Sequence, residues 1–503
     1  MLDGSSRADG RSRGKYPGVL KIENLKNLID GEWVASTTND WIDVTNPATG
    51  EVIAKAPDST IAEIDAAVSA AESAFENWRR VPAVERAQVL YRLKALMEET
   101  IEDLSAVITA ENGKTLDESR GEVRRTIENV EVATGVPSLM MGSNLENVST
   151  GIDEYAVRQP LGVFGMVPPF NFPAMVPMWF MPYAIACGNT YIIKPSEQTP
   201  MAQAHIAELA VESGFPPGVL NVLHGGRSVS EALLEDPRIA GISFVGSSPV
   251  ARDVYRRGTA AGKRMQCQGG AKNYLVVMPD ASMEETVDNL LASAFGAAGQ
   301  RCLAGSVVIA VGEAHDAVAS GLAKGAESVK VGNGVEPGTE MGPVISSASR
   351  DRAIGYIEKG VEEGATLLLD GRTVSVDGDG AGFFLGPTIF DDVEPSMTIA
   401  QEEIFGPVLS VMRADSLDEA IETIDRIPYG NMASIFTSSG KSAREFSSRV
   451  RAGNVGVNVG VAAPMAFFHF GGMKESFYGD LHGQARDAIN FFTDEKIIVE
   501  RWF

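Results

Sequence analysis

The chain has 503 residues, of which 44% are apolar, and none of its apolar runs approaches the ~18 residues of a membrane span. Its 43 Lys and Arg against 67 Asp and Glu give a formal net charge of −24, which repels nucleic acid and anionic membranes. These features argue against a nucleic-acid-binding or membrane protein, and the length predicts two or three globular domains.

The first part of the chain predicts a tail followed by short strands and helices. Residues 1–25 form a Gly-, Ser- and Arg-rich segment that we expect to be a disordered tail. Short strands are predicted over 28–44, around a turn at Asp30-Gly31. Residues 60–135 carry apolar side chains at three- and four-residue spacings, which predicts helices.

From residue 161 the pattern alternates between strands and helices. Strands are predicted at 161–167, 190–193, 219–223 and 242–245, and helices at 175–186, at 201–213 and from 249. Apolar strands alternating with helices predict a parallel sheet that is covered on both faces. Ligands of such sheets bind at the carboxyl ends of the strands.

A second alternation begins near residue 283, where an alanine-rich helix is predicted to lead to Cys302. Strands are predicted at 306–311, 407–413, 432–436 and 453–458, with helices at 315–325 and 348–363. The last segment, 496–503, reads as a strand with aromatic residues at its end. Because an unpaired apolar edge strand is a liability, we expect it to pair with the sheet of another subunit.

Cys302 is the most informative of the three cysteines. It follows a glycine-broken, alanine-rich stretch, and Arg301 precedes it. A neighbouring cation favours the thiolate, which is the nucleophilic form. The alternative is a packed apolar side chain. An odd number of cysteines also argues against a disulfide framework and predicts a reducing cytoplasm.

A phosphate-binding turn is predicted after the strand at 242–245. The fingerprint Gly-x-Gly-x-x-Gly is absent from its expected place, but Gly246 and Ser247 lie between a strand and a helix. Free N–H groups and the dipole at the start of a helix attract phosphate. Lys194 and Glu197 follow a neighbouring strand, where they can bind ribose or phosphate oxygens. An ordinary capped turn and a solvated loop pair are the alternatives.

Several motifs then occur in the order and spacing of one known family. They are Pro169-Phe-Asn171-Phe-Pro173, Lys194-Pro-Ser-Glu197, Phe244-Val-Gly246-Ser247, Gly299-Gln-Arg-Cys302, Glu402-Glu403-Ile-Phe405-Gly-Pro407 and Gly456-Val-Asn458. With these motifs the chain resembles the aldehyde dehydrogenase superfamily over residues 26–503. The resemblance implies an α/β fold with a Rossmann-like NAD-binding domain (26–142 and 163–283), an α/β catalytic domain (284–470) and a small β oligomerisation arm (143–162 and 471–503).

The resemblance also implies roles for single residues. Thiolate addition by Cys302 turns an aldehyde into an alkoxide that can expel hydride and leave a thioester. Asn171 and the backbone N–H of Cys302 would donate to this alkoxide, although Asn171 also fits a plain turn between two prolines. NAD would be held by Pro169, Phe170, Lys194, Glu197, Gly246, Ser247, Glu403 and Phe405. Lys194 and Glu197 would bind its adenosine ribose, Gly246 and Ser247 would face its pyrophosphate, and Glu403 would hold its nicotinamide ribose.

Gln268 departs from the family pattern. The segment that usually reads Glu-Leu-Gly-Gly-Lys is Gln268-Gly-Gly-Ala-Lys272 here. An amide cannot act as a general base, so the thioester should survive until coenzyme A collects the acyl group. In this respect, and in the runs 139–142, 270–273 and 477–480, the chain resembles a CoA-acylating branch, the methylmalonate-semialdehyde dehydrogenases. That resemblance implies oxidation of methylmalonate or malonate semialdehyde to propionyl-CoA or acetyl-CoA with loss of carbon dioxide.

Two arginines fit a substrate that carries a carboxylate, because guanidinium binds carboxylate bidentately. Arg301 adjoins Cys302, and Arg125 matches a second substrate arginine of the branch. The neighbouring Arg124 leaves that match open by one residue. A surface position on a polar helix face is the alternative for Arg125.

Two other functions stay open: a hydrolytic aldehyde dehydrogenase with a different carboxylate such as Glu402 as base, and a catalytically silent scaffold. The five histidines form no metal-spaced pair, so no metal site is predicted. We expect a cytoplasmic homotetramer, a dimer of dimers, whose partners are the semialdehyde and coenzyme A. The acidic surplus predicts a salt-rich cytoplasm, and a merely acidic enzyme is the alternative.

Overall fold

The computed structural model describes residues 23–376 and 381–503. Residues 1–22 of the predicted tail lie outside this range, while β1 (Glu23–Asn24) pairs with β5 (Val52–Pro57). β5 also pairs with β4 (Trp41–Thr45), which completes a small sheet. Within the described residues, no helix is both long and apolar enough to cross a bilayer.

The first large sheet has a parallel centre, as predicted. Its order is β22-β12-β11-β8-β9-β10-β2-β3. The central strands are β8 (Val163–Val167), β9 (Thr190–Ile193), β10 (Leu220–Val222), β11 (Ile239–Val245) and β12 (Arg264–Gln268). Antiparallel edges are formed by β2 (Asn27–Ile29), β3 (Glu32–Val34) and β22 (Phe477–Tyr478). Asp30 and Gly31, with φ of 53° and 80°, form the predicted turn between β2 and β3.

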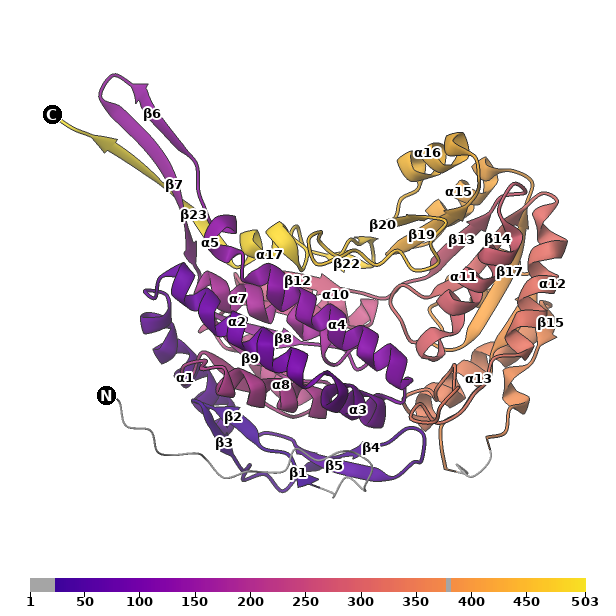
Figure 1. Ribbon diagram of the computed structural model, residues 1–503, viewed down its shortest axis with the longest axis horizontal. Helices are drawn as coiled ribbons and strands as arrows, with labels where there is room; N and C mark the ends of the chain where they lie inside the picture. Colours follow the sequence, from indigo (N-terminus) through magenta and orange to yellow (C-terminus); the bar gives the residue numbers. More distant parts are fainter. Residues whose placement is uncertain (1–22, 377–380) are drawn as a thin grey trace.

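Helices cover both faces of this sheet (Figure 1). One face is covered by α1 (Ile61–Trp78), α9 (Arg227–Glu235) and α10 (Ser248–Ala260). The other is covered by α7 (Met181–Cys187) and α8 (Met201–Glu212). An outer layer of α2 (Ala83–Glu99), α3 (Ile101–Asn112), α4 (Leu116–Ala133) and α5 (Val136–Leu139) packs on this second pair.

The helix predicted at 175–186 is interrupted. α6 (Met175–Met178) ends before Trp179, and α7 begins at Met181 with Pro182 in its first turn. Proline has no N–H to donate to the preceding turn, so a helix can start at this position but cannot run through it. The break leaves the Trp179 ring stacked on Phe470, with ring centroids 4.5 Å apart.

The second large sheet has the order β15-β16-β17-β14-β13-β19-β20 and is parallel except for β15. Its strands are β13 (Asn273–Val277), β14 (Gly305–Val311), β15 (Thr366–Leu369), β16 (Thr388–Asp391), β17 (Val408–Ala414), β19 (Met432–Phe436) and β20 (Asn454–Val457). Its helices are α11 (Met283–Phe295), α12 (Ala314–Glu327), α13 (Ser347–Glu362), α14 (Thr398–Gln401), α15 (Leu417–Arg426) and α16 (Gly440–Arg449). The chain passes from the first sheet to the second between β12 and β13. It returns through β21 (Met473–Lys474), which pairs with β18 (Tyr429–Gly430), to β22 and α17 (Ala485–Phe491).

The helix before Cys302 is shorter than predicted. α11 ends at Phe295, and a tight turn at Gly296–Gly299 follows. Ala297 and Ala298 have φ of 49° and 52°, which is left-handed backbone that alanine rarely adopts. This turn redirects the chain into the loop that carries Cys302.

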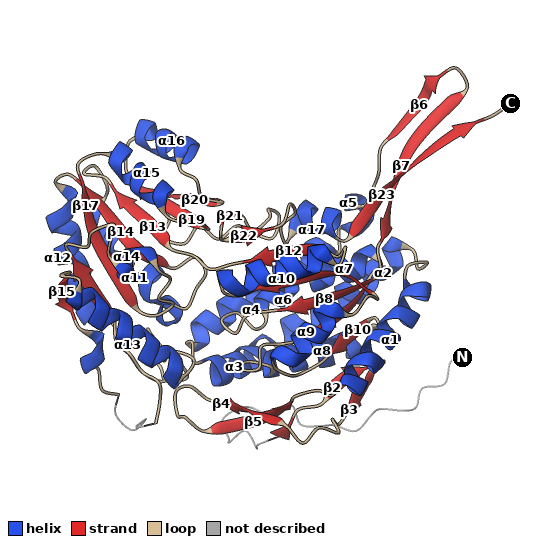
Figure 2. Ribbon diagram, turned by 180° about the vertical axis from the view of Figure 1, so that it is seen from behind, coloured by secondary structure: helices blue, strands red, loops and turns tan. Residues whose placement is uncertain are grey.

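A three-stranded arm projects from the body, as Figures 1 and 2 show. Its order is β23-β7-β6, and it consists of β6 (Asn144–Ser149), β7 (Ile152–Pro160) and β23 (Thr493–Arg501). β23 pairs with β7 of its own chain along its whole length. The predicted α/β fold with a small β arm is therefore confirmed, while pairing of the last strand with a second subunit stays a prediction.

Candidate active site

Two cavities meet at Cys302. The larger has a volume of about 820 Å³ and lies beside the carboxyl ends of the first sheet's strands. The smaller, of about 70 Å³, opens on the other side of the residue. A side chain that is reached from both sides can react with a substrate in one cavity while a cofactor lies in the other.

The larger cavity collects every residue predicted to bind the cofactor. Its walls include Pro169, Phe170, Lys194, Glu197, Gly246, Ser247, Glu403 and Phe405, together with Asn171 and Cys302. These residues come from distant parts of the sequence. The expected grouping is therefore present, and the role of each residue in binding stays a prediction.

The chain around the larger cavity leaves space and free polar groups at the positions where a dinucleotide would lie. Ser247 is the N-cap of α10, and its side chain makes no capping bond to the helix. A Cβ on Gly270 would lie 2.4 Å from Oε2 of Glu403, so only glycine admits that carboxylate at this distance. Lys194 donates through Nζ to the Gly225 carbonyl at 2.9 Å and to Glu197 at 3.2 Å. Donors and an acceptor carboxylate thus line one wall, as recognition of ribose and phosphate requires.

Asn171 lies beside the thiol of Cys302. Its Nδ2 donates to the Gln300 carbonyl at 3.0 Å and to Sγ of Cys302 at 3.7 Å. Burial raises the pKa of the Cys302 thiol to about 11, and the nearby Glu403 acts in the same direction, whereas the Asn171 amide lowers it. The amide donor therefore opposes the effect of burial at the nucleophile.

The expectation that Arg301 favours the thiolate is wrong. Its guanidinium donates through Nη2 to Glu118 at 2.8 Å, so a carboxylate compensates its charge. The pKa of Cys302 is raised rather than lowered. Glu118, the carboxylate that pairs with Arg301, lies on α4, far away in sequence.

Amide side chains hold the loop around Cys302 in place. The Cys302 carbonyl accepts from Nδ2 of Asn273 at 2.9 Å and from Nδ2 of Asn431 at 2.8 Å. Oε1 of Gln300 accepts from the Ile345 N–H at 3.0 Å. Sequence reasoning missed these contacts because an isolated asparagine carries no pattern that identifies its partner.

The smaller cavity contains both predicted substrate arginines. Arg125 and Arg301 line it, together with Phe172, Trp179 and Phe470. Arg124 instead pairs with Glu98 at 2.8 Å and is half exposed. Geometry thus places Arg125 rather than Arg124 beside Cys302. Arg125 in turn pairs with Glu128 at 3.1 Å.

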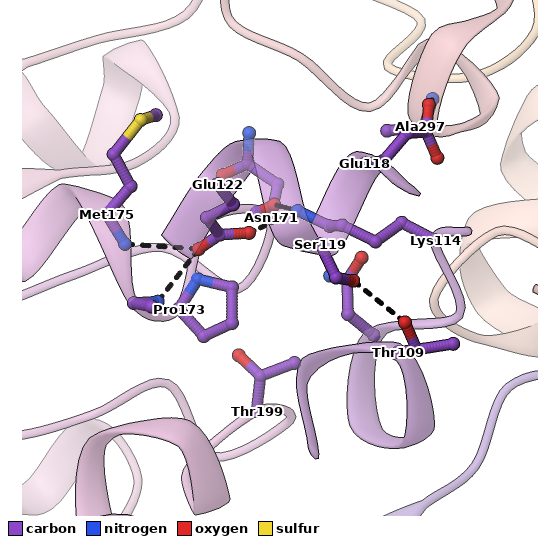
Figure 3. Close-up of polar contacts among 12 residues, drawn as sticks. Thr109, Lys114, Glu118, Ser119, Glu122, Asn171, Pro173, Met175, Thr199 and Ala297 are labelled. Carbon is purple, nitrogen blue, oxygen red and sulfur yellow. Dashed lines mark hydrogen bonds and ion pairs between the residues drawn. The ribbon is translucent and has the colours of Figure 1, made fainter. Parts of the chain in front are cut away.

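Helix α4 carries functional candidates that were not identified from the sequence. Glu118 and Glu122 lie two turns and one turn before Arg125, respectively, on the same face. Glu122 pairs with Lys114 in the interior (Figure 3). The Thr115-x-x-Glu118 capping box was a readable signal for the start of this helix.

The two residues that bear on thioester hydrolysis differ in burial. Gln268 ends β12 and is buried, and its Nε2 has no hydrogen-bond partner among the residues that the structure describes. Glu402 is exposed and accepts from the Tyr356 hydroxyl at 2.7 Å. Within the part of the chain described, neither Gln268 nor Glu402 lines the two cavities that reach Cys302, although Gly269 and Gly270 line the larger one.

One cluster of histidines was not expected from the sequence. His469, His482 and Asp487 place one ligand atom each within 4.8 Å of one another. The two imidazole rings stack, with centroids 4.9 Å apart and an interplanar angle of 23°. Nearly parallel rings do not direct both lone pairs at one point, so this arrangement does not form a preorganised metal site.

Comparisons with known proteins agree with this geometry. Residues 33–498 match the model of the Aldehyde dehydrogenase family. A malonate-semialdehyde dehydrogenase of Geobacillus thermodenitrificans is 51% identical over 96% of this chain and 100% of its own length. One of Halalkalibacterium halodurans is 48% identical over 95% of this chain and 99% of its own.

Solved structures give the same result. A methylmalonate-semialdehyde dehydrogenase of Oceanimonas doudoroffii is 43% identical, with a TM-score of 0.94 over 96% of this chain and 99% of its own. A protein of Sinorhizobium meliloti assigned to the same activity, in complex with NAD, is 41% identical, with a TM-score of 0.94 over 96% and 98%. With matches that span nearly its whole length, the chain belongs to the aldehyde dehydrogenase family.

Proposed function

We propose that this enzyme oxidises malonate or methylmalonate semialdehyde with NAD and transfers the acyl group to coenzyme A. One observation carries the proposal: Cys302 lies between a dinucleotide-sized cavity and a small cavity lined by Arg125 and Arg301. Two guanidinium groups beside a nucleophile suit an aldehyde that also bears a carboxylate. The names of the most similar relatives point to the same substrates.

In this proposal Cys302 attacks the aldehyde carbon, and the oxygen becomes an alkoxide. The Asn171 amide and the Cys302 N–H donate to that oxygen, and losing one such donor typically costs about 3–4 kcal/mol of transition-state stabilisation. The thiol must lose its proton before it attacks. Burial raises its pKa to about 11, so the thiolate is the minor form at neutral pH, and the Asn171 amide favours it.

NAD fits the larger cavity. Lys194 and Glu197 would hold its adenosine ribose, and the start of α10 at Gly246 and Ser247 would face its pyrophosphate. Glu403 would hold its nicotinamide ribose, with Pro169, Phe170 and Phe405 packed nearby. When bound, NAD supplies the hydride acceptor for the oxidation.

The fate of the thioester follows from residue 268. A glutamine cannot activate water, so the acyl group stays on Cys302 until the coenzyme A thiol takes it. Coenzyme A is then a substrate that returns Cys302 as a thiol. A thioester beside a β-carboxylate loses carbon dioxide readily, which gives acetyl-CoA or propionyl-CoA.

The wider organisation is proposed on the same basis. Residues 26–142 and 163–283 would form the NAD-binding domain, and residues 284–470 the catalytic domain, although β13 (Asn273–Val277) already belongs to the second sheet. The oligomerisation part (143–162 and 471–503), of which β6, β7 and β23 form the projecting arm, would assemble a cytoplasmic homotetramer. The net charge of −24 suits a salt-rich cytoplasm.

The decisive experiment measures NADH absorbance with malonate semialdehyde, with and without coenzyme A. We expect a single turnover per site without coenzyme A and steady turnover with it. Gln268→Glu should add steady turnover without coenzyme A and release a free acid. Full turnover of the unmodified enzyme without coenzyme A, with a free acid as product, would reject the proposal in favour of hydrolysis.

A further inference from the structure

The segment that carries Asn171 owes its shape to side chains from neighbouring helices. Residues 168–174 form no helix or strand. The Phe170 carbonyl accepts from Nδ2 of Asn112 at 3.0 Å and from Oγ1 of Thr199 at 3.1 Å. Buried backbone groups need partners, and here they find them outside regular secondary structure. The conformation of the segment therefore depends on those side chains.

One buried ion pair binds this segment at its middle and at its C-terminal end (Figure 3). Nζ of Lys114 donates to Oε2 of Glu122 at 2.6 Å and to the Asn171 carbonyl at 2.6 Å. Oε1 of Glu122 accepts from the N–H groups of Ala174 and Met175 at 2.9 and 3.1 Å. The pair therefore fixes the backbone directly at Asn171 and again three and four residues later.

The pair is sealed from water, since the side chains of Lys114 and Glu122 are 1% and 0% exposed. Nζ of Lys114 also lies 4.2 Å from the centroid of the Phe172 ring. Burying two charges is costly, and apolar replacements often serve stability equally well. Stability alone therefore does not explain why the two buried side chains, Lys114 and Glu122, are charged.

The side chain of Asn171 depends on this backbone anchor. Its Nδ2 reaches Gln300 and Cys302, while its buried Oδ1 has no partner among the described residues. Because only the Nδ2 side of this amide is hydrogen-bonded, the backbone of Asn171 has to set the direction of its side chain. A small displacement of a reacting group can cost about 10²-fold in rate.

We propose that Lys114 and Glu122 are positioning residues that hold the Asn171 amide at the oxygen of the reacting aldehyde. This inference rests on the proposed function, in which Asn171 donates to that oxygen. It predicts that the pair affects hydride transfer through Asn171 and leaves the binding of NAD unchanged. Neither residue lines the two cavities at Cys302 within the described ranges 23–376 and 381–503.

The test is the variant Lys114→Met/Glu122→Gln. Glutamine keeps an acceptor for the N–H groups of Ala174 and Met175, and methionine keeps the packing on Phe172. The ammonium that binds the Asn171 carbonyl is lost. The rate of the first NADH burst, measured by stopped flow with propanal, should fall about 10- to 100-fold, with an unchanged Kd for NAD.

A cycle with Asn171→Ala isolates the mechanism. If the pair acts through Asn171, adding Lys114→Met/Glu122→Gln to Asn171→Ala should slow the burst no further, because the donor is already gone. If the pair had a purely structural role, Lys114→Met/Glu122→Gln would lower the burst rate by the same factor in the unmodified enzyme and in Asn171→Ala. Such multiplicative losses, or a burst at the unmodified rate in Lys114→Met/Glu122→Gln, would overturn the inference.

Two further variants complete the design. Glu111 is a matched control, because it is also buried and accepts from the Met201 and Ala202 N–H groups at the start of α8. Glu111→Gln keeps only one of the two acceptor oxygens, so it should lower the stability but leave the burst unchanged, and an equal loss of burst rate there would count against the inference. If Lys114→Met/Glu122→Gln does not fold, Lys114→Arg keeps the charge pair and should still slow the burst.

Failure of the proposed function would look different. A normal burst in Asn171→Ala would remove the donor role itself, and the inference would fall with it. A slow burst in Asn171→Ala beside a normal burst in Lys114→Met/Glu122→Gln would reject only the positioning role.

Discussion

The thiol of Cys302 lies in surroundings that favour its protonated form. Burial and the charge of Glu403 raise its pKa to about 11, and the amide of Asn171 offsets only part of this effect. Arg301, the cation next to it in sequence, is paired with Glu118. The reactive thiolate is therefore the minor form at neutral pH.

The first prediction is the pH dependence of alkylation of Cys302 by iodoacetamide without ligands. Only the thiolate reacts, so the rate should rise about tenfold per pH unit up to at least pH 10, with no plateau near the ordinary thiol pKa of about 8.5. Asn171→Ala removes a group that lowers the pKa and should slow the reaction at pH 9. Mass spectrometry of Cys302→Ala corrects for Cys187 and Cys267. A plateau below pH 9 would contradict the raised pKa.

At the residue scale, motifs and the family resemblance singled out residues that the structure brings together around two cavities at Cys302, while their roles stay predictions. The environment of each residue was not predictable in this way. The charge of Arg301 is compensated from α4, and the carbonyl of Cys302 is held by Asn273 and Asn431. Such contacts join residues that are distant in sequence, and no local pattern marks them.

At the scale of elements, α4 connects the parts of the site. Oε1 of Glu118 accepts from the Ala297 N–H at 2.6 Å and from Arg301 at 2.8 Å, while its Oε2 accepts from the Thr115 N–H at 3.0 Å. One carboxylate thus caps the helix and holds the left-handed turn before Cys302. Left-handed alanines typically cost about 1–2 kcal/mol each, so this turn needs such support.

The second prediction is the effect of removing that carboxylate. Glu118→Ala should lower the free energy of unfolding by about 1–3 kcal/mol, because buried N–H groups lose a charged partner. It should also slow hydride transfer with propanal about tenfold as the turn relaxes. Glu118→Gln keeps one acceptor oxygen, which can serve the Ala297 N–H, while its NH2 group cannot accept from the Thr115 N–H, so it should restore only part of the rate.

Asp117 provides the matched control for Glu118. It lies in the same first turn of α4, but its side chain is 92% exposed and pairs only with Arg120 among the residues described. Asp117→Ala removes the same charge without touching the turn and should leave both quantities unchanged. Equal effects of Asp117→Ala and Glu118→Ala would mean that the loss of a negative charge at the start of α4 causes them, and not the loss of the contact between Glu118 and the turn.

Periodicity predicted most elements of both sheets, because apolar strands and amphipathic helices follow local rules. It did not predict β12 and β13, which surround the glycine-rich segment before Asn273. It also missed that α6 and α7 are separate helices, since apolar residues continue through the break. The break is set by Pro182, and it leaves Trp179 stacked on Phe470.

At the scale of the whole molecule, the arm exposes apolar side chains along its strands. β6 is exposed along its length, and Ile497 and Val499 of β23 are 60% and 59% exposed. Trp502, just beyond the strand, is 77% exposed. Exposed apolar side chains together with two open sheet edges are what the proposed assembly requires, in which another subunit would cover this surface.

The last prediction tests this assembly. Ile497→Asp/Val499→Asp places charges on the arm, where each buried aliphatic side chain would contribute about 1.5–3 kcal/mol to association. We expect the mass from light scattering to fall from that of an oligomer toward 53.5 kDa, the mass of one chain. Val361→Asp is the control, because Val361 is 46% exposed on α13, which is not part of the arm. It should leave the mass unchanged. If the arm variant keeps the mass of the unmodified enzyme, these side chains do not lie in the interface, and the arm must have another role.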